Sequence, residues 1–176
     1  MIQTERLVIR PWRDADRAPY AAMMADPEVG YWLGATLTEA EANAQVDRFI
    51  AQGGQGEPGF LALDRRSDGA FLGAACLRRV QGEHPLAGEF EVGWRLTRAA
   101  WGAGYATEAA RALMDEGFGR LGLTEIVSFT AVSNARSRAV MERLGFQRRP
   151  SRDFDHPALA PEHPLRPHVV YIVRKP

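Results

Sequence analysis

The chain has a single cysteine among its 176 residues, Cys76, so no disulfide can form within it. Cys76 lies in the apolar run LGAACLRR, with no second thiol or metal-ligand spacing around it. A chain without disulfides is typical of a reducing compartment. We therefore expect a buried, unreactive thiol and a cytoplasmic protein.

The sequence also lacks an excess of either charge and any long apolar run. Lys plus Arg and Asp plus Glu number 22 each, so no overall field would attract nucleic acid or an anionic membrane. No stretch approaches the roughly 20 apolar residues that span a bilayer, and the N-terminal MIQTERLVIR has no apolar segment of signal-peptide length. We expect neither nucleic acid nor membrane as a partner, and any anion site must be local. Monomer and homodimer both stay open.

Hydrophobic periodicity predicts a mixed α/β chain that forms a single domain over residues 1–176. Strands are predicted over residues 6–10, 59–64, 70–79, 88–96, 125–132 and 168–175, and helices over 13–26, 36–52, 106–121 and 133–146. Consecutive strands in the middle indicate antiparallel pairing. The strand, helix and strand between 88 and 132 indicate a parallel crossover.

Local signals mark several ends of these elements. Thr38 and Glu41 have the spacing of a capping box, and RRSDG at 65–69 is typical of a hairpin turn. Ser133 or Asn134 is the predicted N-cap of the last helix. Gly145 has the position of a left-handed residue after that helix.

The segment WGAGYATEA, residues 101–109, places glycines where a helix begins. The first turn of a helix has unpaired N–H groups and a positive dipole end, so a glycine-rich entry favours a bound phosphate. Gly102 and Gly104 have no side chain, and Ala103 and Ala106 have small ones. The same residues are also typical of a tight turn with close helix packing, and this alternative stays open.

Two phosphate-binding motifs do not fit this segment. A P-loop requires Lys and then Ser or Thr after its last glycine, but Tyr105 and Ala106 follow Gly104. A dinucleotide fingerprint requires a third glycine where this chain has Thr107. It also requires an acidic residue at the end of the next strand, whereas Glu125 begins that strand.

A third motif fits better. The segment FEVGWRLTRAAWGAGYATEA resembles the acyl-CoA signature of the GNAT superfamily of N-acetyltransferases, with Gly104 and Ala106 at its small-residue positions. Trp101 stands where the family has Gln or Arg. The segments TERLVIRPWRDAD, NARSRAVMERLGF and DFDHPALAPEHPLRPHVVY resemble the branch that contains the ribosomal-protein N-terminal (Rim-type) acetyltransferases. The resemblance spans nearly the whole chain.

The resemblance implies the GNAT acyl-CoA N-acyltransferase fold, an α/β fold with a mixed, mostly antiparallel central sheet that is splayed in the middle and flanked by helices. It implies acetyl-CoA as co-substrate, without a metal, and direct attack by a primary amine. Backbone N–H groups of Val92 to Leu96 would meet the pantetheine arm, and one near Val92 or Gly93 would stabilise the oxyanion. The implied cofactor-binding residues are Val92, Trp94, Leu96, Trp101, Gly102, Ala103, Gly104, Tyr105, Ala106, Thr107, Asn134 and Ser137.

Two of these assignments have structural alternatives: an ordinary paired strand over residues 92–96, and a helix cap with no other role at Asn134. Arg136 and Arg138 either meet the 3′-phosphate or face water.

Glu91 is the predicted general base. Strand alternation places it on the face of Gly93 and Arg95, so its carboxylate either points toward the acceptor or pairs with Arg95. The family often has a tyrosine as general acid where this chain has Met141, and Ser137 occupies the position of a serine considered for that role in the ribosomal branch.

For the acceptor, a lysine amine costs roughly 4.6 kcal/mol to neutralise at pH 7 and an α-amine only about 1.1 kcal/mol, which favours the α-amine of a protein N-terminus or an amine of a small molecule.

Tyr31 and Trp32 are expected in the core rather than in a pocket wall. The proline-rich segment with His156, His163 and His168 is predicted to be a structural loop, not a metal site.

Two alternative functions remain. An aminoglycoside-type enzyme would need an acidic cleft, for which Glu28, Glu39, Asp153 and Asp155 are the contributors. A non-catalytic acyl-CoA sensor would bind the cofactor without turnover.

Overall fold

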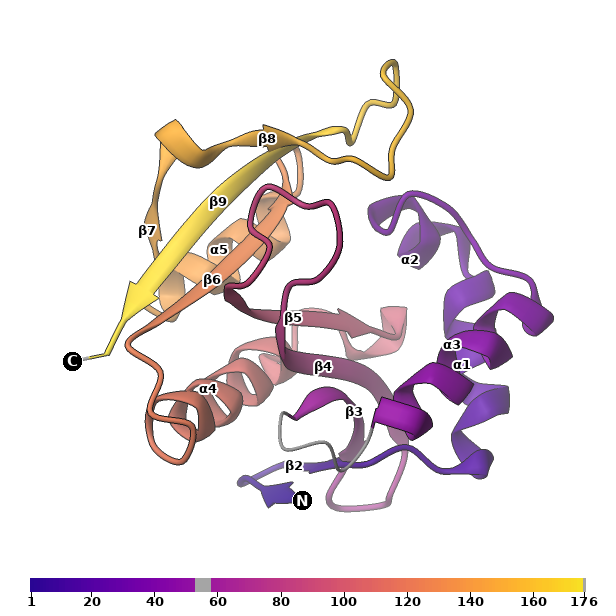
Figure 1. The fold of residues 1–176 in the computed structure, drawn as a ribbon. Helices are drawn as coiled ribbons and strands as arrows, with labels where there is room; N and C mark the ends of the chain where they lie inside the picture. Colours follow the sequence, from indigo (N-terminus) through magenta and orange to yellow (C-terminus); the bar gives the residue numbers. More distant parts are fainter. Residues whose placement is uncertain (53–57, 176) are drawn as a thin grey trace.

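In the computed structural model, which describes residues 1–52 and 58–175, a nine-stranded sheet has helices on both faces (Figure 1). The strands are β1 (Ile2–Gln3), β2 (Leu7–Arg10), β3 (Gly59–Arg65), β4 (Phe71–Arg79), β5 (Phe90–Leu96), β6 (Glu125–Ala131), β7 (Gln147–Arg148), β8 (Phe154–Asp155) and β9 (Pro167–Arg174). The helices are α1 (Arg17–Ala25), α2 (Pro27–Trp32), α3 (Glu39–Gln52), α4 (Tyr105–Phe118) and α5 (Ala135–Arg143), with single 3₁₀ turns at Asp14–Asp16, Arg98–Ala100 and Pro150–Arg152. Within the described ranges, no helix has the length and apolar character to cross a membrane.

The sheet is antiparallel except at one place. Its order is β1-β2-β3-β4-β5-β6-β9-β7, with β8 also paired to β9. β5 runs antiparallel to β4 along its whole length, but it pairs in parallel with β6 at a single register position, Glu91 with Val127. Beyond Glu91 the two strands separate, so the edge of β5 that faces β6 is open toward Leu96. The predicted fold class, with its splayed middle, is confirmed.

The two faces of the sheet bury different sets of side chains. On β3 and β4, Leu63 and Ala75 pack with α4 and α5, whereas Ala62 and Ala74 pack with α1 and α3. This alternation is the period of two expected of a strand that is buried on both sides. Figure 1 shows α1 to α3 on one side of the sheet and α4 on the other.

Most of the local signals have the predicted structure. Thr38 and Glu41 form the capping box, and the 65–69 turn joins β3 to β4. Gly145 has φ +86°, and Asn134 rather than Ser133 caps α5. The long predicted strands and helices are all present.

The segment between α1 and α3 differs from the prediction, which treated residues 26–38 as a link. It contains the six-residue helix α2, with Pro27 in the first turn and an Asp26 side chain that accepts a hydrogen bond from the Glu28 N–H. Asp before Pro at a helix start is a recognisable signal. The helix is too short to show a periodic apolar stripe, which is why periodicity missed it. The two-residue strands β1, β7 and β8 were missed for the same reason.

A buried charge network joins β2 to the start of α1. Arg10 donates two hydrogen bonds to Asp16, each of 2.7 Å, and two to Asp64, of 2.5 and 3.0 Å. Arg10 is 5% exposed and Asp16 only 3%. Burial pushes the pKa of Asp16 upward, but the Arg10 hydrogen bonds outweigh it and hold that pKa below its ordinary value. The ionised carboxylate therefore stabilises the fold.

We predict that Asp16→Asn lowers the free energy of unfolding in urea by about 3–5 kcal/mol, because it leaves Arg10 buried with one counterion fewer. Since the folded pKa of Asp16 is depressed, its contribution is present above the ordinary aspartate pKa and is lost as pH falls through the folded value. The matched control is Asp14→Asn, which removes the exposed pair with Arg17 and should change stability little. Equal losses in the two variants would contradict this account.

Candidate functional site

The turn before α4 is a group of free backbone donors. Gly102 and Gly104 have φ of +76° and +83°, and Gly104 is the N-cap of α4 without a side-chain cap. The N–H groups of residues 102–107 donate to no described residue. A Cβ built on Gly102 would meet nothing within 4 Å, so the space in front of the turn is open. Free N–H groups at the positive end of a 14-residue helix form a site for an anion.

Two arginines that the sequence did not single out lie beside this turn. Arg6 donates to the Ala103 carbonyl at 2.8 Å and pairs with Glu108, which compensates its charge. Arg143 donates to the Thr107 hydroxyl at 3.3 Å and has no carboxylate partner in the described part of the chain. Both are distant in sequence from the turn, Arg6 just before β2 and Arg143 at the end of α5, so only the folded chain brings them to it.

Trp101 links the turn to the end of β5. Its indole N–H donates to the Leu96 carbonyl at 3.0 Å, and the Arg136 guanidinium lies 4.7 Å from the centroid of its ring. The residue at the family's Gln or Arg position therefore has a structural role. Arg136, for which sequence left phosphate and solvent open, stacks on Trp101 at the rim of the pocket, and Arg138 bonds the Val132 carbonyl.

A pocket of about 1840 Å³ extends from this turn across the splay to the links before α3 and before β9. Of the predicted residues it is lined by Glu91, Trp94, Leu96, Trp101, Gly102, Gly104, Tyr105, Ala106, Thr107, Asn134 and Ser137. Two do not line it: the Val92 side chain is buried in the core, and Ala103 lies outside the lining. The structure thus brings together residues from β5, α4 and α5 that are up to 46 positions apart between Glu91 and Ser137.

Glu91 pairs with Arg78, not with Arg95, so that alternative of the sequence analysis was wrong. The Arg78 Nη2 to Glu91 Oε1 distance is 2.5 Å, and the Glu91 side chain is 8% exposed. The two residues are direct partners in the β4–β5 register, which is the tertiary signal that sequence spacing could not supply. Burial raises the pKa of Glu91 above its ordinary value, while Arg78 and, more weakly, Arg95 oppose the shift.

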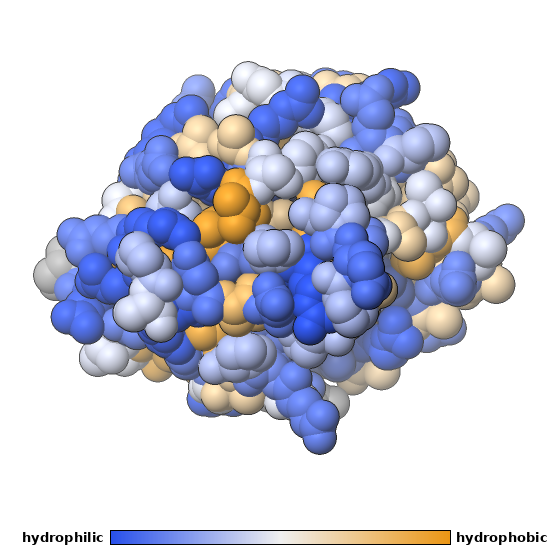
Figure 2. All heavy atoms as spheres, turned by 90° about the horizontal axis from the view of Figure 1, so that it is seen from above, coloured by the Kyte–Doolittle hydropathy of each residue, from blue (hydrophilic) through white to orange (hydrophobic). Residues whose placement is uncertain are grey.

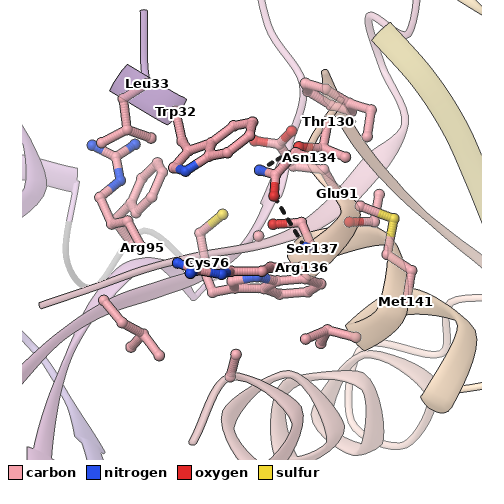
Figure 3. Close-up of a pocket in the computed structure, with 18 of the residues that line it drawn as sticks. Trp32, Leu33, Cys76, Glu91, Arg95, Thr130, Asn134, Arg136, Ser137 and Met141 are labelled. Atoms are coloured by element: carbon pink, nitrogen blue, oxygen red, sulfur yellow. Dashed lines mark hydrogen bonds between the residues drawn. The ribbon is translucent and has the colours of Figure 1, made fainter. Parts of the chain in front are cut away.

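Polar groups of α5 face Glu91 across the splay (Figure 3). Asn134 accepts a hydrogen bond from the Ser137 N–H at 3.2 Å and donates to the Thr130 hydroxyl at 3.0 Å, so it acts as a cap. The Ser137 hydroxyl has no hydrogen-bond partner in the described ranges and is not enclosed. Met141, at the position where the family often has a tyrosine, is a buried apolar part of the pocket wall.

The aromatic residues of α2 do not lie in the core, contrary to the expectation. Tyr31 is 50% exposed, and Trp32 is half-buried in the pocket wall beside Leu33 (Figure 3). Figure 2 shows apolar residues gathered near the middle of an otherwise mostly hydrophilic face. Cys76 is buried, as predicted, and it also lines the pocket. Burial raises the pKa of its thiol to about 12.

The far wall of the pocket is a cluster of rings. His84, His156 and His168 pack with Phe129 and Phe154, with 5.8 Å between the first two imidazole centroids and 4.8 Å between the last two. Burial lowers the pKa of all three, that of His168 to about 4, so the cluster is neutral near pH 7. Sequence analysis missed His84, which comes from the β4–β5 link. His163 lies apart, and the described residues contain no metal-binding group.

Comparison with known proteins adds to this geometry. The family model described as "Acetyltransferase (GNAT) domain" matches residues 6–147. An acetyltransferase from Agrobacterium tumefaciens is similar in structure, with a TM-score of 0.78 and 30% identity over 99% of this chain and 94% of that one.

Two curated relatives are informative. The chain is 33% identical over 150 residues to the FsC-acetyl coenzyme A-N(2)-transacetylase of Aspergillus fumigatus, covering 82% of this chain but only 63% of the length of that protein. It is 26% identical over 136 residues to the Bacillus subtilis protein YdaF, whose name proposes a ribosomal N-acetyltransferase, covering 76% of this chain and 73% of that protein.

We predict that Gly102→Ala weakens acetyl-CoA binding by about 10- to 100-fold, because a left-handed alanine re-orients the N–H groups that would bind phosphate. Gly122→Ala is the matched control. Gly122 also has a positive φ, +64°, and open space in front of it, but it follows α4 and does not line the pocket. Isothermal titration of wild type and both variants measures the effect. Equal affinities in the two variants would show that the turn does not hold the cofactor.

Proposed function

Because the chain belongs to the GNAT acetyltransferase family, whose domain model covers residues 6–147, we propose that it transfers acetyl from acetyl-CoA to a primary amine, at a protein N-terminus or on a small molecule. Membership in this family was predicted from the motifs and is confirmed. The observation that carries the proposal is that the free N–H groups of residues 102–107 open into the same pocket as Glu91 and the splay. We further propose that residues 1–176 act as one domain in the cytoplasm.

The residues present fit acetyl-CoA. The N–H groups of 102–107 would hold the pyrophosphate, with Arg143 adding positive charge beside Thr107. The open edge of β5 from Val92 to Leu96 would offer backbone groups to the pantetheine amides. Asn134 lines the same pocket, and its amide nitrogen has a second hydrogen to donate. Acetyl-CoA supplies the acetyl group as a thioester.

Glu91 is the proposed general base. As the amine nitrogen bonds to the thioester carbon, the carboxylate accepts one proton from that nitrogen. Burial favours this step because it raises the pKa of Glu91 toward that of the amine, while Arg78 keeps the carboxylate ionised and in position. An N–H near Val92 or Gly93 would stabilise the oxyanion.

The departing sulfur needs only modest help. When the carbon–sulfur bond breaks, the electron pair stays on sulfur, and a thiol pKa of roughly 8.5 makes the thiolate a tolerable leaving group. The unpartnered Ser137 hydroxyl would donate the proton. Met141 has none to give, so Ser137 is the candidate acid on α5.

The charges around the pocket favour a single amine over a polycation such as an aminoglycoside. Three of the four acidic residues considered for that substrate pair with arginines: Glu28 with Arg98, Asp153 with Arg148 and Asp155 with Arg166. An α-amine also needs less help to lose its proton than a lysine does.

We predict that Glu91→Gln lowers kcat/KM by about 10²–10⁴-fold while acetyl-CoA still binds. In the wild type, kcat/KM should rise with pH through a pKa above the ordinary glutamate value, because burial raises that pKa. This rise of kcat/KM with pH should be absent in Glu91→Gln. CoA release from a panel of amines, N-terminal peptides first, measures both.

The control for this variant is Glu89→Gln, two residues earlier and just before β5, whose carboxylate pairs with Arg152 outside the pocket. It should retain wild-type kinetics. Cofactor binding without turnover of any amine would instead indicate a non-catalytic sensor.

We also predict that Ser137→Ala lowers kcat by about tenfold or less, since thiolate leaves without strong acid help. The loss should be smaller for an acyl donor with a more acidic thiol. An unchanged kcat for both donors would remove Ser137 from the mechanism.

A further inference from the structure

Arg95 is a cation of the pocket wall without a carboxylate partner. Its Nη1 donates to the Tyr20 hydroxyl at 2.9 Å and to Gln45 Oε1 at 3.3 Å. Its guanidinium carbon lies 4.6 Å from the centroid of the Phe60 ring. Tyr20 in turn donates to Gln45 at 2.6 Å. All of these partners are neutral, and Arg95 forms no ion pair with a described residue. Glu91 attracts it only weakly and is already paired with Arg78.

The hydrogen bonds of Arg95 leave one edge of its guanidinium free. Nε and Nη2 donate to no described residue, and neither nitrogen is enclosed by protein. Together these two nitrogens form the planar fork that binds a carboxylate with two parallel hydrogen bonds. Because Nη1 is tethered through Tyr20 and Gln45 to α1 and α3, the fork is held in place before any ligand arrives.

Arg78 differs from Arg95 in its charge balance. Both guanidiniums lie over the Phe60 ring, within 5.2 Å of its centroid. Arg78, however, is neutralised by Glu91. These three charged groups leave this part of the floor with one net positive charge. The neighbouring histidine cluster adds no charge near pH 7, and Glu83 of the β4–β5 link is exposed.

The surroundings of Arg95 would strengthen binding of an anion. Trp32, Leu33 and Cys76 lie around it in the pocket (Figure 3). Apolar walls lower the local dielectric, so a charge pair is stronger there than in water.

The position of Arg95 sets the length of the ligand. It lies on the same face of β5 as Glu91 and four residues further along, at roughly 3.3 Å per residue or about 13 Å between the two Cα atoms. Glu91 is held by Arg78 of β4, and Arg95 is held by Tyr20 of α1 and Gln45 of α3, so an acceptor that contacts both side chains has its amine and its carboxylate several bonds apart.

We propose that the acceptor is a small amine with a carboxylate several bonds away, such as a short peptide with a free C-terminus, and that Arg95 binds this carboxylate through Nε and Nη2. The inference rests on the proposed function, because it assigns the acceptor of the same site. Arg95 then determines specificity, while Glu91 and Ser137 act at the reacting end.

Triglycine and triglycinamide test this, since they differ only in the carboxylate. Both are titrated into the CoA-saturated protein, followed by tryptophan fluorescence and calorimetry, and both are assayed as acceptors with acetyl-CoA. We expect the carboxylate to bind about 10- to 100-fold more tightly and to give a correspondingly higher kcat/KM. This comparison needs no variant, so it does not depend on how a substitution folds.

Variants locate the effect. Arg95→Gln should bring the triglycine to triglycinamide ratio close to 1. Arg95→Lys, which keeps the charge but not the fork, should leave an intermediate ratio. The matched control is Arg120→Gln, which removes an exposed arginine paired with Glu116 away from the pocket and should keep the wild-type ratio.

Equal affinities for the two peptides, no binding of either, or a preference that survives Arg95→Gln would overturn the inference. Acetyl-CoA titration reads the proposed function separately. If acetyl-CoA binds and amines are acetylated without regard to the carboxylate, only the inference about Arg95 fails. If acetyl-CoA does not bind at all, the proposed function itself fails.

Discussion

The single register position that joins β5 to β6 is the constraint on which the rest of the site depends. A fully paired β5 would donate and accept its backbone hydrogen bonds within the sheet, and no pocket would cross it. Because pairing stops at Glu91 and Val127, the next five residues of β5 keep one edge open. The strand then leads through the 3₁₀ turn at Arg98–Ala100 and Trp101 to the free N–H groups at the start of α4, so the open edge of β5 and the glycine turn face one pocket.

Charge is distributed unevenly along this pocket. At the α4 end, free N–H groups and Arg143 favour phosphate. On the side of α1 and α3, Arg78 neutralises Glu91, whereas Arg95 is held only by neutral partners. The ring cluster around His168 adds shape without charge near pH 7, because burial keeps its imidazoles unprotonated. A guanidinium without an ion-pair partner in such surroundings costs free energy unless a ligand brings a negative charge to it.

Local signals in the sequence were sufficient where the interacting residues are close along the chain. The capping box at Thr38, the cap at Asn134, the left-handed Gly145 and the glycine turn before α4 were all predicted and are all present. Errors arose where contacts are distant. Strand alternation predicted an ion pair of Glu91 with Arg95, four residues along the same strand, as one alternative. The partner of Glu91 is Arg78 on β4, and only the register of the β4–β5 pair brings the two residues together.

The sequence by itself determined the order of the elements, the family and the place of the glycine turn, since periodicity, caps and glycine conformation are properties of neighbouring residues. Tertiary structure alone decided which charges are compensated and what surrounds Arg95. In the sequence, nothing distinguishes Arg95 from the other arginines. It differs from Arg78 because Tyr20, Gln45 and Phe60 from three other elements hold it, and none of them has a negative charge.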